Sequence, residues 1–296
     1  MLPHHDRYDY SPIDERPGYA WPEGRRLAFY VCIAVEHFAF GAGLGEDFAV
    51  VNAPPNDRSY AWRDYGQRIG LWRLVEMLDE LGIPASFAMN GVLPALRPEI
   101  ARRIAARGDE IIAHGRTSSE TTDGMWRHDE AAVVQGVTRN LTALGGQRPL
   151  GWSSPGLVQG ARTMDVLHEA GYRYVLDWPA DDQPFWIRAG SERLLSIPFP
   201  LETNDITVIA HQHHGAREFA DILVNQFDEM IAQSADRPLV LPLVLHPYIA
   251  GQPFRLRPLR KALEHCLRAE GRDAVWLTRP GEIASHCEAL PPDRIP

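Results

Sequence analysis

The chain has 296 residues, of which 45% are hydrophobic and 23% charged, and its formal net charge is −9 at pH 7. This is the composition of an ordinary globular protein with enough apolar material for a large core. The negative charge argues against nucleic acid and anionic membranes as partners, because both repel an acidic surface. No apolar run is long enough to span a membrane and the N-terminus has no secretory pattern, so we expect a cytoplasmic protein. The three cysteines show no CxxC spacing, which indicates reduced thiols.

One pattern recurs along the chain: a helix with apolar residues at helical spacing ends at a glycine, and a short apolar run rich in β-forming residues follows. Before its first occurrence, the almost wholly apolar segment 27–35 is typical of a buried strand. The predicted helix–strand pairs are, in chain order, 64–81 with 83–89, 98–107 with 110–114, 129–144 with 149–153, 161–170 with 172–177, and 258–270 with 274–278.

The apolar run 239–245 completes a set of seven candidate strands. Short apolar strands that alternate with amphipathic helices are covered on both faces, which indicates a mostly parallel α/β sheet. No GxGxxG motif follows the first strand, so a dinucleotide-binding open sheet loses its main support and a barrel is favoured. We expect one catalytic domain over residues 1–296, with an N-terminal arm at 1–25, a long loop at 41–63 and a tail at 290–296.

Polar side chains follow five of the predicted strands. In a barrel the carboxyl ends of the strands gather at one face, where catalytic residues lie. Hydrolysis of an amide needs a base for the water, a stabiliser for the oxyanion and an acid for the leaving nitrogen. One histidine at a strand end is more often structural, but several carboxylates and imidazoles at the same mouth indicate a catalytic site. The strand-end residues are Glu36 and His37, His114 with Arg116 and Ser118, Trp152 with Ser153, Asp177 with Trp178, and His246.

These strand ends resemble the motifs of the polysaccharide deacetylase, or NodB-like, superfamily. The motifs are a strand-end acid, Ala113-His114-Gly115, Trp152-Ser153-Ser154-Pro155-Gly156 and Leu245-His246-Pro247, in the order of the family and within about residues 22–287. Phrases such as Tyr60-Ala61-Trp62-Arg63-Asp64 and Thr203-Asn204-Asp205 are most similar to the branch of PuuE-type metal-independent allantoinases and cyclic imide hydrolases. The resemblance implies a distorted (β/α)7-type barrel, a hydrolase of non-peptide carbon–nitrogen bonds with a small-molecule substrate, and a homo-oligomer.

The departures from the family pattern concern a metal ion. The metal-dependent deacetylases have two aspartates after the first strand and two histidines four residues apart after the third. This chain has Glu36 followed by His37, whose side chain should point to the opposite face, and Ser118 stands four residues after His114. Catalytic zinc takes three protein ligands and a water. We therefore expect no metal and no other cofactor; if zinc is bound, Glu36 and His114 are its candidate ligands.

An enzyme without a Lewis acid needs a substrate whose acyl–nitrogen bond is already weakened. In an imide or ureide a second carbonyl shares the nitrogen lone pair, so acids, bases and hydrogen bonds can suffice. The predicted reaction is therefore ring opening of a cyclic imide of the succinimide, glutarimide or phthalimide type. Allantoinase is the first alternative, although residues 116–120 stand where that branch has bulky aromatics. A metal-dependent de-N-acetylase of polysaccharide or peptidoglycan and a non-catalytic binding barrel are the others.

The roles of the candidate residues are hypotheses. Glu36 or His114 would activate water, and His246 would handle the proton of the leaving nitrogen. The residues expected to hold carbonyl oxygens are Arg116, Ser118 and Ser153. The aromatic residues expected to stack on a flat substrate are Trp152, Trp178, Trp186 and Tyr248, although packing is the commoner role for each one taken alone.

Overall fold

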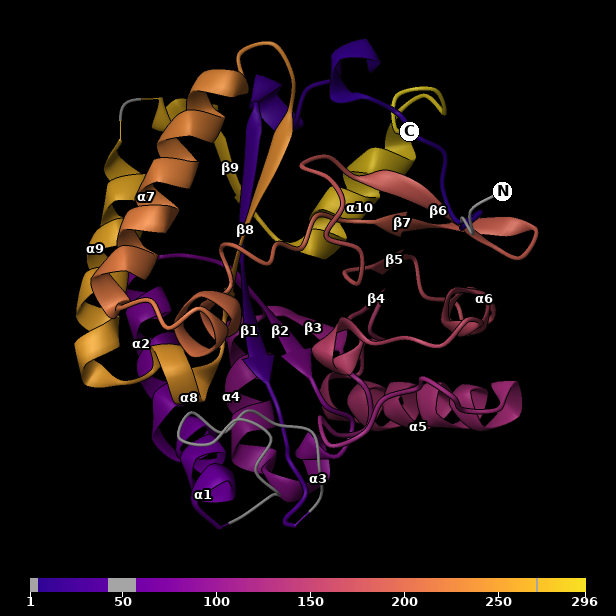
Figure 1. Cartoon of the computed structure of the whole chain (residues 1–296), viewed down its shortest axis with the longest axis vertical. Helices are drawn as coiled ribbons and strands as arrows, with labels where there is room; N and C mark the ends of the chain where they lie inside the picture. Colours follow the sequence, from indigo (N-terminus) through magenta and orange to yellow (C-terminus); the bar gives the residue numbers. More distant parts are fainter. Residues whose placement is uncertain (1–4, 42–56, 270) are drawn as a thin grey trace.

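The computed structural model describes residues 5–41, 57–269 and 271–296. Its strands form one sheet in the order β6-β7-β5-β4-β3-β2-β1-β8, with β9 also paired to β1 (Figure 1). Neighbouring strands are parallel except for β6 and β7. The strands are β1 (Leu27–Val35), β2 (Ala85–Met89), β3 (Glu110–Ala113), β4 (Gly151–Trp152), β5 (Tyr174–Val175), β6 (Phe185–Ala189), β7 (Glu192–Ser196), β8 (Leu239–Leu245) and β9 (Val275–Thr278).

The strand β1 lies at the centre of the arrangement because three strands pair with it. Along one edge it pairs with β8, while β9 and β2 pair with residues 27–30 and 31–35 respectively. On its other side β8 meets the segment that follows β7, since Val244 N donates to Thr203 O at 2.9 Å and Asn204 forms a parallel bridge with Val244. The sheet is thus a curled half-barrel, which confirms the predicted distorted (β/α)-barrel type of fold.

The side chains of β1 alternate between two apolar layers. Ala28, Tyr30 and Cys32 pack inside the curled sheet with residues of other strands, among them Tyr174. Phe29 and the other odd-numbered residues pack in the layer between the sheet and the helices. Because successive side chains of a strand point to opposite faces, a strand buried on both faces must be apolar throughout.

Helices cover the outer face of the sheet, with α2, α7 and α9 along one side of it (Figure 1). The helix α2 buries a stripe that includes Leu74 and Leu78, and it ends at Gly82, whose φ of +66° is a conformation that glycine adopts without steric cost. Within the described residues no helix has the length and apolarity needed to cross a membrane. The α-helices are α1 (Asp57–Tyr65), α2 (Leu71–Leu81), α3 (Leu93–Leu96), α4 (Pro98–Arg107), α5 (Arg127–Gly145), α6 (Thr163–Glu169), α7 (Ala216–Gln233), α8 (Pro247–Ala250), α9 (Pro253–Arg268) and α10 (Pro280–Ala289).

The predicted boundaries agree best with the structure where the sequence is most strongly apolar. The strands β1 and β8 and the helix α4 coincide with the predicted segments 27–35, 239–245 and 98–107. The hairpin β6–β7 and the helices α7 and α10 have no counterpart among the predicted elements. The helix α9 begins five residues before the predicted start at 258, so Pro258 lies inside it.

The long predicted loop at 41–63 also differs from the structure. Residues 57–63 belong to α1, whereas 42–56 lie outside the described residues. The helix α5 starts at Arg127, so Asp129 lies in its first turn and does not cap it.

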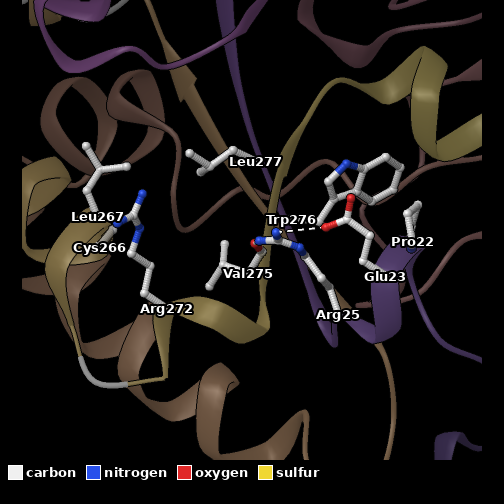
Figure 2. A pocket seen from close by; sticks show the side chains of 9 residues that line it. All are labelled: Pro22, Glu23, Arg25, Cys266, Leu267, Arg272, Val275, Trp276 and Leu277. Atoms are coloured by element: carbon white, nitrogen blue, oxygen red, sulfur yellow. Dashed lines mark hydrogen bonds and ion pairs between the residues drawn. The ribbon is translucent and has the colours of Figure 1, made fainter.

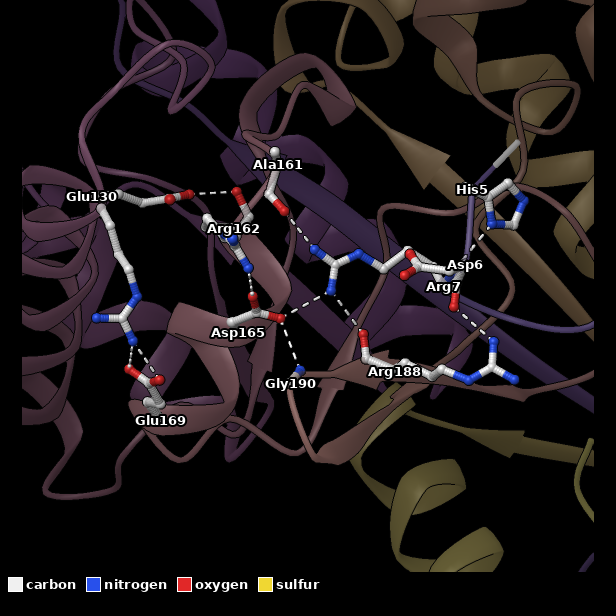
Figure 3. Close-up of polar contacts among 12 residues, drawn as sticks. His5, Asp6, Arg7, Glu130, Ala161, Arg162, Asp165, Glu169, Arg188 and Gly190 are labelled. Atoms are coloured by element: carbon white, nitrogen blue, oxygen red, sulfur yellow. Dashed lines mark hydrogen bonds and ion pairs between the residues drawn. The ribbon is translucent and has the colours of Figure 1, made fainter. Parts of the chain in front are cut away.

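Both ends of the described chain lie against the edge strand β6. Arg188 N donates to Arg7 O at 2.7 Å, and Trp186 N donates to Pro296 O at 2.6 Å. The Arg7 guanidinium forms an ion pair with Asp165 at 2.9 Å and also donates to the Arg188 carbonyl (Figure 3). The arm and the C-terminal segment therefore occupy a strand edge that would otherwise be open to pairing with another chain.

Candidate active site

A cavity of about 440 Å³ lies at the carboxyl ends of the strands. Glu36, His114 and His246 line it, one each from the ends of β1, β3 and β8. Each continues the inward alternation of its strand, as Ile112 and Val244 do two residues earlier on β3 and β8. The other polar lining residues are Ser118, Thr121, Ser153, Ser154, Asn204, Thr207, His211 and Tyr248. The apolar lining residues include Ala34, Phe38, Leu157, Val158, Phe199, Leu201 and Ile206.

The Glu36 carboxylate lies between the two histidines. Its Oε1 is 3.5 Å from His114 Nε2, and its Oε2 is 3.8 Å from His246 Nε2. Burial acts to raise the pKa of Glu36, but the hydrogen bond and charge of a protonated His114, the charge of His246 and the nearby Ser118 hydroxyl outweigh it and lower the pKa to about 2. Glu36 is therefore ionised throughout the physiological range and is a weak base.

The His114 ring is fixed from one side only. Its Nδ1 is 2.8 Å from the Ser153 carbonyl oxygen, which can only accept, so Nδ1 carries the hydrogen. The other ring nitrogen, Nε2, is buried and has no hydrogen-bond partner among the described residues. In the neutral ring this places a lone pair beside the Glu36 carboxylate, where a water molecule could donate to both groups.

His246 is held by Asp205, a residue that the sequence analysis quoted only as part of a family phrase. The Asp205 carboxylate accepts from His246 Nδ1 at 2.7 Å and from the backbone N of His246 at 2.9 and 3.0 Å. Burial acts to lower the pKa of His246, but the charge of Asp205, its hydrogen bond and the charge of Glu36 raise it above its ordinary value. Asp205 therefore supports a proton on the His246 ring, and Nε2 of this ring faces Glu36.

Asn90 joins the loops that follow β1 and β3, and sequence reasoning missed it. Its side-chain oxygen accepts from His37 N at 2.6 Å and from the Ser118 hydroxyl at 3.3 Å, and its amide nitrogen donates to the His114 carbonyl. Asn90 is fully buried. Its place directly after β2, at the same sheet edge as the other strand-end residues, is the signal that could have identified it.

Asp177, another strand-end residue, is buried but does not line the cavity. Its carboxylate accepts from Ser154 N at 2.6 Å and from the Ser154 hydroxyl at 2.7 Å. Burial raises the pKa of Asp177 to about 6 despite these hydrogen bonds. Asp177 thereby fixes the loop whose preceding residue, Ser153, holds His114.

Six predicted site residues are brought together at the cavity and four are not. The six are Glu36, His114, His246, Ser118, Ser153 and Tyr248. Arg116 points outward and pairs with Glu120, four residues further on, at 2.5 Å. Trp152 is fully buried in the outer apolar layer against Tyr172, because its neighbours along β4 take the inward positions.

Trp178 and Trp186 lie on the side of the sheet that the N-terminal arm covers. The ring of Trp178 packs edge-on against Tyr8, with centroids 5.6 Å apart. The ring of Trp186 stacks under the Arg193 guanidinium at 4.0 Å, in a different hollow. The prediction that these two rings and Trp152 contact a substrate in the same cavity is not supported by their positions.

The donor set does not fit the metal site of the metal-dependent deacetylases. Within the described ranges, no group of three His, Cys, Asp or Glu side chains is arranged to hold a metal ion. Glu36 Oε2 and His114 Nε2, the two buried site atoms without a hydrogen-bond partner there, are two ligands where catalytic zinc takes three. Ser118 is hydrogen-bonded to Glu36 and supplies no second imidazole. We derive no step through a metal.

Neither the Cys32 thiol nor a second hollow beside β9 contributes to the proposed chemistry. Cys32 lines the cavity, but burial raises the pKa of its thiol to about 12, so it stays protonated and is no nucleophile. A smaller hollow of about 250 Å³ lies beside β9, where Arg25 pairs with Glu23 near Arg272 and Trp276 (Figure 2). It is lined by residues near the amino end of β1, away from the strand ends that carry the histidines.

Comparisons with known proteins agree with this architecture. The polysaccharide deacetylase family model matches residues 55–175. The structure of PuuE allantoinase is 28% identical, with a TM-score of 0.85 over 96% of this chain and 99% of that one. A Pseudomonas aeruginosa PAO1 protein named as a probable polysaccharide deacetylase is 27% identical, with a TM-score of 0.83 over 93% and 95% of the two chains. A Schizosaccharomyces pombe protein named for the same family is 23% identical over 95% of each chain. The chain is thus similar to polysaccharide deacetylases of the NodB-like type, through the family model over residues 55–175 and through its fold over nearly its whole length.

Proposed function

We propose that this protein hydrolyses the ring of a small cyclic imide by acid–base catalysis, without a resident metal. The observation that carries the proposal is the line Asp205–His246–Glu36–His114, buried at the end of a cavity and built from separate strand ends. It supplies a proton donor and a proton acceptor on either side of one carboxylate. The similarity to an allantoinase and to deacetylases supports the coarser assignment, a hydrolase of carbon–nitrogen bonds.

His114 is the base in this proposal. The neighbouring histidines make Glu36 a weaker base than an ordinary carboxylate, whereas the Nε2 lone pair of a neutral His114 faces the same space. Glu36 orients the water and stabilises the positive charge that His114 acquires. Of the two residues that could activate water, Glu36 and His114, the proposal therefore assigns this role to His114.

His246 is the acid. The water oxygen bonds to one ring carbonyl carbon while its proton passes to His114, and the carbon–nitrogen bond of the resulting oxyanion then breaks. The nitrogen takes a proton from His246 Nε2, so the products are an amide and a carboxylic acid on one open chain. The acid ionises, and one water is consumed per turnover. Ser118 and Ser153 lie within the same lining and are the candidate donors to carbonyl oxygens.

The test is hydrolysis of succinimide, phthalimide, allantoin and an N-acetylated glycan in parallel, with metal analysis of the purified protein. We expect imide turnover that survives a chelator and falls by about 10²–10⁴ in His114→Ala and in His246→Ala. His211→Ala is the matched control, since His211 also lines the cavity but lies outside the proposed line. Turnover that disappears with chelator and returns with Zn²⁺ would instead indicate a metal-dependent deacetylase.

Allantoinase is the second candidate, favoured by the similarity to PuuE allantoinase along nearly the whole chain. Allantoin is a ureide, so the same acid–base line could open it. A kcat/KM for allantoin above that for every imide would select this reaction. No turnover of any of the four compounds would favour a binding role.

A further inference from the structure

The charges around the cavity exclude one class of substrate. Glu36 is the acidic residue in its lining, and no lysine or arginine of the described residues lines it. Residues 1–4, 42–56 and 270, which lie outside the description, contain no lysine or arginine in their sequence. An anionic substrate would therefore lie beside the ionised Glu36, and the one cation that the proposed mechanism places in this lining, the imidazolium of His246, is already paired with Asp205, which makes binding of an anion unfavourable.

Part of the cavity lining is apolar. Leu157, Val158, Phe199, Leu201 and Ile206 line it, and we refer to these five residues as the apolar wall. Val158 and Leu201 are each 40% exposed, so part of the wall meets solvent when nothing is bound. Exposed apolar surface that lines a cavity is typical of a binding site.

Leu157 is held in the wall by a backbone conformation that leucine rarely adopts. Its φ is +56°, next to Gly156 at +62°, and its backbone N donates to Ser154 O at 2.9 Å. A left-handed leucine is sterically unfavourable, and such residues concentrate where a site needs a side chain in a fixed place. Glycine or asparagine would fit this turn more easily, so folding alone does not require the leucine.

The cavity is also larger than a bare imide ring needs. Cavities of about 300–1,000 Å³ hold drug-sized ligands, and this one measures about 440 Å³. A ring whose carbonyl faces Glu36 and His114 leaves room on the side of the apolar wall.

From these observations we infer that the preferred substrate is an uncharged imide with an apolar group on a ring carbon, and that Leu157 is a specificity-determining residue that contacts this group. The reaction in this inference is the one in the proposed function, and the inference rests on it. The binding preference for an uncharged, apolar ligand does not depend on that reaction.

Two measurements test the inference separately from the reaction. The first compares kcat/KM for succinimide, phenylsuccinimide substituted on a ring carbon, and carboxymethylsuccinimide. We expect the phenyl compound to exceed succinimide by roughly tenfold or more, and the carboxylate compound to be the poorest. The second measures binding of the corresponding lactams by calorimetry, since a lactam lacks the second carbonyl that weakens the bond.

The variants Leu157→Gly and Leu157→Asn test whether Leu157 determines the preference for an apolar group. Both should fold with wild-type stability or better and lose most of the phenyl preference in both measurements. Leu290→Asn is the control, because Leu290 is partly buried and does not line the cavity.

Each outcome is decisive. Lactams that bind in the expected order without turnover of any imide would support the apolar wall and overturn the proposed reaction. Imide turnover with no phenyl preference, or with equal acceptance of the carboxylate compound, would overturn the inference and leave the reaction standing. A phenyl preference that survives in both Leu157 variants would remove that residue from the assignment.

Discussion

The substitution Asp205→Asn tests the acid in the proposed mechanism. Asp205 is fully buried. One of its oxygens, Oδ1, accepts both from His246 Nδ1, at 2.7 Å, and from His246 N, at 3.0 Å. Asparagine has the same shape and retains one oxygen acceptor at this place. The substitution therefore removes the negative charge and replaces Oδ2, which accepts from His246 N at 2.9 Å, by an amide donor.

The expected loss of activity follows from one charge-assisted hydrogen bond. A hydrogen bond to a charged group contributes about 1.5–3 kcal/mol. At about 1.4 kcal/mol per tenfold in rate, kcat should fall roughly 10- to 150-fold in Asp205→Asn if the bond supports the imidazolium of His246 in the transition state.

The direction of the pH dependence is the sharper test. Burial acts to lower the pKa of His246, and Asp205 and Glu36 raise it; Arg255 lies within electrostatic reach of Asp205 on the other side. Without the Asp205 charge the pKa of His246 must fall. Because the acid acts in its protonated form, activity is lost as the pH rises through this pKa, so the alkaline limb should move to lower pH in the variant.

The assay is the pH–rate profile of kcat/KM for the best imide, for wild type, Asp205→Asn and the control Asp181→Asn. Asp181 forms an ion pair with Arg16 at 2.6 Å and does not line the cavity, so its removal should leave the profile unchanged. An alkaline limb that stays in place in Asp205→Asn, or moves to higher pH, would refute the role of His246 as the acid.

Three further predictions concern groups outside the cavity. Burial raises the pKa of Asp177 from 3.8 to about 6, so the folded state resists ionisation of this group. The free energy of unfolding of wild type, measured with urea, should therefore fall by up to about 3 kcal/mol relative to Asp177→Asn as the pH rises from about 4 to about 6. A difference between the two proteins that stays constant over this range would contradict the prediction. Asn90→Ala should lower kcat more than tenfold in the folded fraction with KM near wild type, because Asn90 positions residues without lining the cavity; a change in KM alone would oppose this role. Leu74→Ala, a fully buried truncation on α2, should cost about 2–5 kcal/mol by thermal or urea unfolding with imide specificity unchanged.

The sequence predicts the parts of this protein that follow from periodicity. A strand buried on both faces is apolar at every position, which is why β1 and β8 were found at their true bounds. The same alternation places Glu36, His114 and His246 inside the curled sheet. On β4 it places Ser153 inside and Trp152 outside, so the prediction that Trp152 contacts the substrate does not follow from the strand pattern.

The rest depends on contacts that periodicity does not contain. Asp205 reaches His246 from a segment 41 residues earlier in the chain, and the loop that carries it is placed by its bridge to β8. Arg116 is turned away by an ion pair with Glu120. The strand β6 was missed because its exposed Arg188 interrupts the apolar pattern and its edge is covered by the chain ends.

The outer partners of the two histidines distinguish one ring from the other. Asp205 fixes the hydrogen of His246 on Nδ1, and the Ser153 carbonyl fixes that of His114 on Nδ1, so both Nε2 atoms face Glu36. The charge of Asp205 supports a proton on His246, whereas the outer partner of His114 is a neutral carbonyl. This difference is the reason why the proposed mechanism makes His246 the acid and His114 the base.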